Sequence, residues 1–217
     1  MTAVKKGDVK SSEKVPLSKD KILIYTAVGI LVLVLVFVAA IKLYDPEPEL
    51  PVETFKGYIF VQRADFWHFN WKKDAETTFT VSLRFHPREA LDVPIEGELL
   101  DKFNAFVDEH QEVYVTFNPQ AENFTYTALA AGELSLSVAR ALDVTPIAAC
   151  TFDDGTDTCV ERPVVTCDDT DKAVIFLDDV EDETKITLKD NCMIISGRGM
   201  EKLRAVDRVL YHWYRVY

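Results

Sequence analysis

Four cysteines in the second half of the chain have the residue type and spacing for covalent cross-links or for a metal site. They are Cys150, Cys159, Cys167 and Cys192. An even number of cysteines is typical of two disulfides in an oxidising compartment. Three pairings are possible, and we favour Cys150–Cys159, which closes a polar loop, with Cys167–Cys192, which ties one strand end to another. A four-thiolate zinc site is the alternative, but intervals of eight, seven and 24 residues lack the close pairs of a zinc knuckle.

Three carboxylates surround Gly155 inside the first expected disulfide loop, and they are the best candidate for an ion site. They belong to Asp153, Asp154 and Asp157. Carboxylate oxygens are calcium ligands, but this segment lacks the ligand spacing and the closing glutamate of an EF-hand. We therefore favour a solvated turn, with a calcium site as the alternative, and we expect no cofactor. Asn123 begins an Asn-Phe-Thr glycosylation sequon, which is usable only if this part of the chain is exported.

No short catalytic or nucleotide-binding motif occurs in the sequence. The four histidines lack metal-ligand spacing, and there is no HExxH, GxSxG, GxGxxG or GxxxxGK[ST] pattern. This favours a non-catalytic protein but does not exclude an enzyme, because catalytic groups can come together from distant positions. The enzyme alternative is an exported, membrane-tethered, hydrolase-like protein. In it His86, an acid and a serine or threonine would meet in a cleft at the ends of parallel strands.

The elements that must position these residues begin with an apolar stretch at 22–41, which has 20 residues without a charge. That length suffices for a helix to cross the ~30 Å hydrocarbon core of a bilayer. Six lysines precede the stretch and acids follow it, which predicts a cytoplasmic N-terminus and an exported C-terminal part. A cleavable signal peptide is one alternative, but the apolar run is long for it. A buried helix is another, but such helices rarely run this far without a charge.

The chain therefore divides into a polar cytoplasmic tail at 1–21, a transmembrane signal anchor at 22–44, an acidic proline-rich stalk at 45–54 and an extracytoplasmic domain at 55–217. Beyond residue 44 it holds 17 basic and 33 acidic residues, a net charge of −16. Such a surface repels phosphates, so the charge argues against nucleic-acid binding. It serves solubility or, alternatively, docks cations or basic partners. The expected partners are the lipid bilayer and other envelope or membrane proteins.

Alternating and continuous apolar runs predict a mixed α/β domain with one mixed sheet and about three helices. The expected strands are 58–63, 66–71, 77–85, 112–117, 146–150, 173–177, 185–188 and 192–196, and the expected helices are 97–110, 126–142 and 200–214. The segment 112–150 reads as strand, helix and buried strand, which requires a parallel pair with a right-handed crossover. Asp207 falls on the apolar face of the last helix, so we expect an ion pair with Arg204, Arg208 or a basic residue elsewhere.

Several runs in the second half resemble stretches of uncharacterised single-pass membrane proteins of archaea. In chain order these runs are ALAAGELSLSVARALDVTPIAAC, RPVVTC, NCMIISG and AVDRVLYHWY. The similarity covers roughly residues 113–217 together with the layout of the anchor. It implies an exported, disulfide-bearing domain on an archaeal membrane and brings no activity with it. We therefore expect a membrane-anchored, extracytoplasmic interaction or structural module of the cell envelope, without catalysis.

Overall fold

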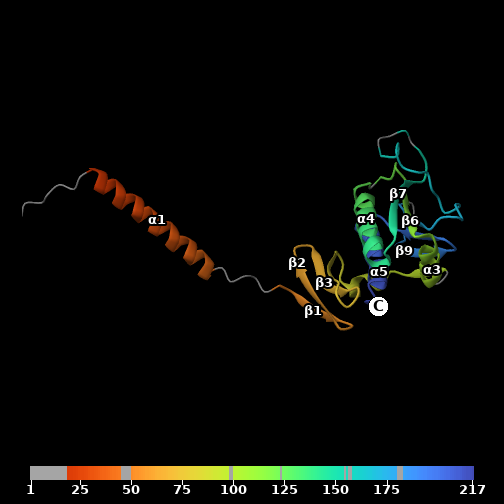
Figure 1. Cartoon of the computed structure of the whole chain (residues 1–217), viewed down its shortest axis with the longest axis horizontal. Coiled ribbons are helices and arrows are strands. Elements are labelled where there is room, and N and C mark those ends of the chain that lie inside the picture. The colour runs from red at the N-terminus through yellow and green to blue at the C-terminus, as the bar shows by residue number, and fades with distance from the viewer. Residues whose placement is uncertain are drawn as a thin grey trace, which may run out of the picture. The chain divides into compact units, whose positions relative to one another are not determined.

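The computed structural model describes residues 19–44, 50–97, 100–122, 124–153, 155, 158–179 and 183–217 (Figure 1). The chain separates into two compact units, Met1–Glu49 and Leu50–Tyr217. The described part of the first unit is a single helix, and the second unit holds both sheets and the other helices.

Helix α1 (Lys19–Tyr44) is apolar on every side, as a helix surrounded by lipid must be. Its segment Leu23–Leu43 is long and apolar enough to cross a membrane, and almost all of its side chains are exposed. The hydroxyl of Thr26 donates to the carbonyl of Leu23 at 2.9 Å, so this polar group is satisfied within the helix. The helix therefore has the length and composition of the expected membrane anchor.

Four antiparallel strands form a small sheet at the start of the larger unit, in the order β1-β2-β3-β4. They are β1 (Val52–Phe55), β2 (Tyr58–Arg63), β3 (Phe66–Lys72) and β4 (Thr78–Leu83). Lys56 and Gly57 make the tight turn between β1 and β2, and both have positive φ (46° and 87°), as a two-residue hairpin loop requires. The inner face of the small sheet buries Phe60, Trp67, Phe69, Trp71, Val81 and Leu83. The outer-face residues alternate with these along each strand.

A six-stranded mixed sheet forms the second layer, in the order β5-β9-β10-β8-β6-β7. Its strands are β5 (Ile95–Gly97), β6 (Glu112–Phe117), β7 (Thr145–Cys150), β8 (Val174–Asp178), β9 (Lys185–Lys189) and β10 (Cys192–Ser196). All neighbours pair in parallel except β9 and β10, which are antiparallel. The parallel neighbours β6 and β7 are joined through helix α4 (Phe124–Ser137), which confirms the expected strand–helix–strand unit.

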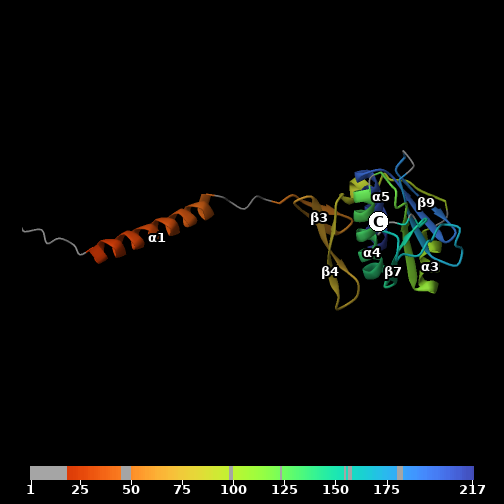
Figure 2. The ribbon, with the colours of Figure 1, turned by 90° about the horizontal axis from the view of Figure 1, so that it is seen from above.

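Two helices lie between the sheets in both ribbon views (Figure 1, Figure 2). They are α4, which continues as the π-helical turn Val138–Leu142, and α5 (Met200–Trp213). The ring of Tyr211 on α5 lies 6.0 Å from that of Phe60 and 5.9 Å from that of Phe69, so α5 packs on the small sheet. Helices α2 (Pro87–Ala90) and α3 (Leu100–His110) are shorter, and α3 adds Phe103 and Val107 to the same core.

The strands form two sheets, whereas the sequence predicted one. Short turns connect the consecutive strands from β1 through β4, so each strand pairs with its neighbour in the chain. This four-stranded meander is complete before the first strand of the second sheet begins. Three elements were not predicted: β1, β5 and α2. Each has only three or four residues, too few to show a periodicity. Strand β1 also takes up residues 52–54 of the expected stalk.

Replacing Phe60 by alanine tests the two faces of β2. Phe60 is fully buried, so its truncation leaves a cavity, and we expect the free energy of unfolding to fall by about 3–5 kcal/mol. The control is Ile59→Ala, because Ile59 is the adjacent residue on the outer face and is 61% exposed. Its expected effect is within about 0.5 kcal/mol. Guanidinium unfolding of the full chain in detergent measures both, and equal losses would contradict this assignment of faces.

Candidate functional site

The carboxyl ends of parallel strands are where an open α/β sheet most often places a site. Strand β8 ends at Asp178 and β10 ends at Ser196, both side chains are buried, and the Ser196 hydroxyl donates to Asp178 at 3.3 Å. A Cβ at Gly197 would lie 3.0 Å from the backbone nitrogen of Lys202. The absent side chain at Gly197 therefore lets the first turn of α5 pack directly against the end of β10.

Lys202 is the buried cation at this edge of the sheet. Its side chain is fully buried, and its ammonium group donates to Thr127 Oγ1 at 3.0 Å and pairs with Asp179. The Thr127 hydroxyl donates in turn to the other oxygen of Asp179 at 3.0 Å. Burial lowers the pKa of the Lys202 ammonium, and the charges of Asp179 and Asp178 oppose this shift. Ammonium, hydroxyl and carboxylate thus form a closed triangle.

A lysine beside a hydroxyl is also the arrangement of Ser/Thr–Lys nucleophilic catalysis, which needs a free amine and an accessible hydroxyl. Here Thr127 is fully buried and Lys202 is held in an ion pair. The triangle instead ties α4 and α5 to the residue that follows β8. Sequence reasoning missed Lys202. The available signal was its spacing, four residues before Val206 and seven before Val209, on the buried side of α5.

Asp207 is the second fully buried ionisable residue of α5. Its Oδ2 accepts hydrogen bonds from the backbone N–H groups of Arg84 at 2.9 Å and Phe85 at 2.8 Å, just after β4. The expected ion pair with Arg204 or Arg208 is not formed among the described residues. The physical reason is that the chain leaves the sheet after β4 with two partly buried backbone N–H groups, and these donors need an acceptor.

Glu133 on α4 belongs to the same interior polar region. Its Oε1 accepts a bond from Arg84 Nε at 2.9 Å. Burial raises the pKa of Asp207 well above its ordinary value. The two backbone N–H bonds oppose this shift and the charge of Glu133 adds to it. Burial also raises the pKa of Glu133, against the attraction of Arg84. Asp207 Oδ1 and Glu133 Oε2 have no hydrogen-bond partner in the described part of the chain. The environment therefore favours a protonated Asp207.

His86 caps helix α2 beside a cavity of about 420 Å³. Its backbone N–H donates to Glu89 at 2.7 Å, and its Nδ1 accepts from the backbone N–H of Arg88 at 3.3 Å. The accepting Nδ1 leaves the proton of the neutral ring on Nε2, which lies 3.6 Å from the carboxylate of Glu53. Burial lowers the pKa of His86, and the charge of Glu53 opposes this.

This cavity brings His86 together with an acid but with no hydroxyl nucleophile. The described residues that line it are Glu53, Gln62, Trp67, Arg84, Phe85, His86, Arg88 and Glu89. None of them is a serine, threonine or cysteine. The cavity also lies beside the small antiparallel sheet, whereas the enzyme alternative places its cleft at the ends of parallel strands.

The four cysteines form the bonds Cys150–Cys159 and Cys167–Cys192, the two pairs that the sequence favoured. Both bonds involve the connection from β7 to β8, residues 151–173. Such a parallel crossover usually contains a helix. The described residues of this connection contain turns and one bridge, between Val164 and Cys150. The bonds therefore hold in place a crossover that has no helix in its described part.

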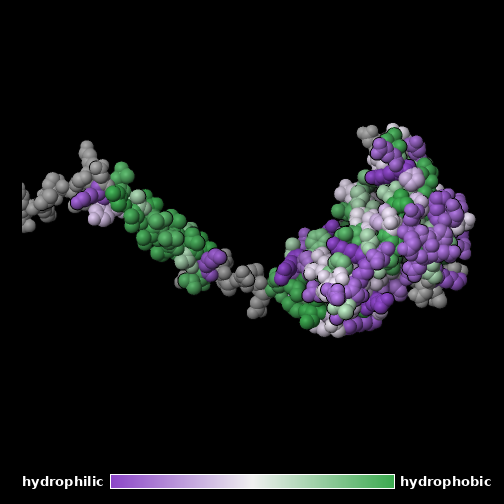
Figure 3. Space-filling view, viewed as in Figure 1, coloured by the Kyte–Doolittle hydropathy of each residue, from purple (hydrophilic) through white to green (hydrophobic). Residues whose placement is uncertain are grey.

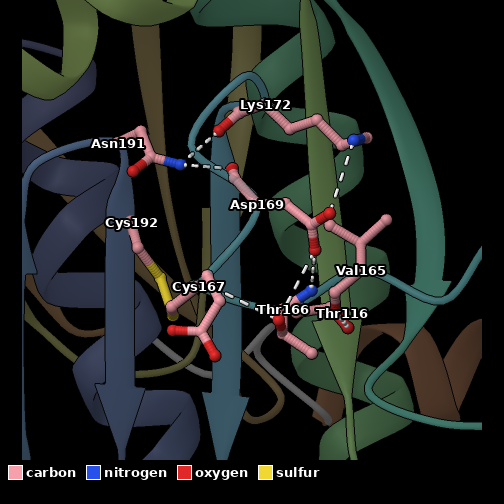
Figure 4. Close-up of a disulfide and its surroundings, with 9 residues drawn as sticks. Thr116, Val165, Thr166, Cys167, Asp169, Lys172, Asn191 and Cys192 are labelled. Carbon is pink, nitrogen blue, oxygen red and sulfur yellow. Dashed lines mark hydrogen bonds and ion pairs between the residues drawn. A yellow bond between two sulfur atoms is a disulfide. The ribbon is translucent and has the colours of Figure 1, made fainter.

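Hydrogen bonds complete the attachment of this crossover to the sheet (Figure 4). The buried hydroxyl of Thr116 on β6 donates to the carbonyl of Val165 at 2.7 Å. The amide group of Asn191, just before β10, donates to the carbonyls of Asp169 at 2.8 Å and Lys172 at 2.6 Å. The segment 164–172 is thereby fastened at Cys167 and at both ends.

The remaining sequence candidates lie in or near the first disulfide loop. Asp153 accepts a hydrogen bond from the backbone N–H of Gly155 at 2.9 Å, which is a turn contact. Asp154, Asp157 and the sequon residue Asn123 lie outside the described residues. Within the described ranges, no group of three or more His, Cys, Asp or Glu side chains is placed to hold a metal ion.

Comparison of the chain with protein-family models, with curated proteins and with solved structures gave no match. The resemblance of residues 113–217 to archaeal membrane proteins therefore stays an expectation.

Removing Lys202 tests the triangle at the strand ends. In Lys202→Met the carboxylate of Asp179, whose side chain is 10% exposed, loses its cation, and we expect the free energy of unfolding to fall by about 3 kcal/mol. In Lys202→Met with Asp179→Asn the unpaired charge is gone, so the loss is smaller than in the single variant. Denaturant unfolding measures both, and the control is Lys189→Met, because Lys189 is the exposed last residue of β9. Additive losses in the double variant would contradict the pairing.

Asp207 gives a pH dependence whose sign follows from its raised pKa. The unfolded carboxyl titrates near pH ~4, so between that pH and the folded-state pKa only the folded chain holds this proton. Wild type should therefore lose stability relative to Asp207→Asn as the pH rises above about 4. The asparagine keeps an oxygen for the two N–H donors. Asp207→Leu, which does not, should be less stable than the asparagine variant at every pH, by about 2 kcal/mol. Unfolding curves from pH 4 to 8 test this, and a pH-independent difference between wild type and Asp207→Asn speaks against it.

Proposed function

We propose that the chain is a single-pass membrane protein with a cytoplasmic N-terminus, whose larger unit acts outside the cell as a non-catalytic interaction or structural module of the envelope. Following the resemblance of residues 113–217, we propose further that this envelope is archaeal. Helix α1 supports the membrane attachment, because Leu23–Leu43 can span a bilayer. The two disulfides support an oxidising location for the larger unit.

The observation that carries the non-catalytic proposal is how the reactive groups of the interior are used. Lys202 and Thr127 are enclosed in the triangle with Asp179. Asp207 accepts two backbone N–H groups. His86 caps a helix. These side chains hold elements together, and such a role leaves them unavailable to a substrate.

The exported enzyme remains the second candidate because of the cavity beside His86 and Glu53. With no serine, threonine or cysteine among the described lining residues, that enzyme would have to use water as its nucleophile. The geometry therefore supports the non-catalytic module better.

Exposed apolar side chains on the larger unit support an interaction role. Leu136 on α4 is 52% exposed, and Val160 and Val164 on the disulfide-bonded crossover are 65% and 51% exposed. Isolated exposed apolar residues are common on soluble proteins. The two elements that carry these side chains also form the walls of one cavity of about 350 Å³ through other residues, among them Ala131 of α4 and Arg162 of the crossover. A partner protein would gain apolar contact there.

A photo-crosslinking side chain at position 160 tests this role in intact membranes. We expect adducts with another envelope or membrane protein from position 160 and none from a control at exposed Lys189. Protease added outside the cell should remove the larger unit and leave the N-terminal tail intact. Recovery of the chain only as an unpartnered monomer would count against the interaction module, and four free thiols would count against the external location.

A further inference from the structure

The outer face of the small sheet is unusual because its β1–β2 half exposes aliphatic side chains. The register of the four strands places these residues together on this face: Val52, Thr54, Ile59, Val61, Arg63, Phe66, His68, Asn70, Lys72, Thr78, Thr80 and Ser82. An antiparallel sheet with one face packed on the core usually presents polar residues on the other. Here the strands β1 and β2 present Val52 and Ile59, which are 59% and 61% exposed. Figure 3 shows a hydrophobic area over these two strands.

The half of the outer face on β3 and β4 is polar and satisfies its own hydrogen bonds. The Ser82 hydroxyl and His68 Nδ1 are 2.8 Å apart, and the Thr80 hydroxyl donates to the Asn70 side-chain oxygen at 3.1 Å. A hollow of about 350 Å³ lies where the apolar and polar halves meet, with Ile59 among its lining residues. The exposed aliphatic side chains Val52 and Ile59 of this face therefore lie on β1 and β2, and its hydrogen-bonded polar side chains lie on β3 and β4.

Net charge also differs between the small sheet and the rest of the larger unit. Residues 50–85, which include the small sheet, hold five basic and four acidic residues, whereas residues 86–217 hold 12 basic and 26 acidic residues. The net negative charge of the larger unit, which repels phosphate groups, is thus carried by residues 86–217. Two exposed cations, Lys56 and Arg63, stand at opposite ends of β2.

The small sheet is also the part of the larger unit that follows the apolar helix in the chain. Seven residues, 45–51, separate the last residue of α1 from the first residue of β1. From Tyr44 to Val52 the chain makes eight residue steps, which span at most ~29 Å even when fully extended. If α1 crosses a bilayer, the start of β1 is therefore held within that distance of the end of the helix.

We propose that the β1–β2 half of the outer face binds the surface of the lipid bilayer. The side chains of Val52 and Ile59 enter the boundary between headgroups and acyl chains, and Lys56 and Arg63 pair with lipid phosphates. The polar half on β3 and β4 contacts headgroups and water. This inference rests on the proposed membrane attachment. It adds that the larger unit lies on the membrane with its neutral sheet and keeps its acidic part away from lipid phosphates.

Quenching of tryptophan by brominated lipid tests the inference. The full chain with Ile59→Trp is reconstituted into vesicles of phosphatidylcholine with one-fifth phosphatidylglycerol, with and without bromine on the acyl chains. The control is Val160→Trp, because Val160 is 65% exposed on the disulfide-bonded crossover. The native residues Trp67, Trp71 and Trp213 are 7%, 6% and 5% exposed, and they give the same background in both variants.

We expect the added tryptophan at position 59 to be quenched at least twofold more than the one at position 160. The ratio should fall when Lys56→Glu and Arg63→Glu are added to the Ile59→Trp chain. Equal quenching at the two positions in vesicles that carry the protein would overturn the lipid contact while leaving the membrane attachment intact. Failure of the chain to float with the vesicles would instead overturn the attachment. A protein adduct from a photo-crosslinker at position 59 in native membranes would replace the lipid by a protein partner.

Discussion

Burial of helix α5 on more than one side joins the two sheets of the larger unit. A helix on a protein surface needs one apolar stripe, but a helix between two layers needs apolar residues around most of its circumference. Nine of the 14 residues of α5 are buried. Tyr211 packs against the aromatic inner face of the small sheet, and the helix also contacts β10 of the larger sheet. Without α5, the inner face of each sheet would lose a large part of its cover.

The two buried ionisable residues of α5 act on different neighbours. Lys202, in the first turn, reaches α4 and the residue after β8, whereas Asp207 reaches the backbone just after β4. Neither contact stabilises the fold in the way that apolar burial does. Burying an ionisable group costs desolvation free energy, which its hydrogen-bond and ion-pair partners must offset. What these contacts add is position. Each contact fixes the rotation of α5 about its axis, and its position along that axis, relative to one neighbour. Nonspecific apolar contacts fix these two quantities less well.

The sequence was most informative where an element is long or strongly patterned. Strands 58–63, 112–117 and 192–196 were predicted to the residue, because alternating or continuous apolar runs define them. The division into two sheets was not predictable, because strand partners are set by contacts beyond the local pattern. The partner of Asp207 was missed for a related reason. A buried acid suggests a nearby cation, but the actual donors to Asp207 are backbone N–H groups of a segment distant in the sequence. Every residue type except proline has such a group, so the residue types could not identify these donors. Lys202 was detectable from its place among buried helix positions.

If the larger unit is exported as proposed, the disulfide-bonded crossover also sets the order in which the two bonds can form. If the larger unit crosses the membrane behind helix α1, its residues emerge in chain order. Cys159 follows Cys150 by nine residues, so the first bond can close while the rest of the chain is still inside the cell. Cys167 must wait another 25 residues for Cys192, at the start of β10. Throughout that interval Cys167 is the one cysteine outside without its native partner. Formation of the native Cys167–Cys192 bond would therefore require that β10 cross the membrane before Cys167 reacts with the thiol of another chain.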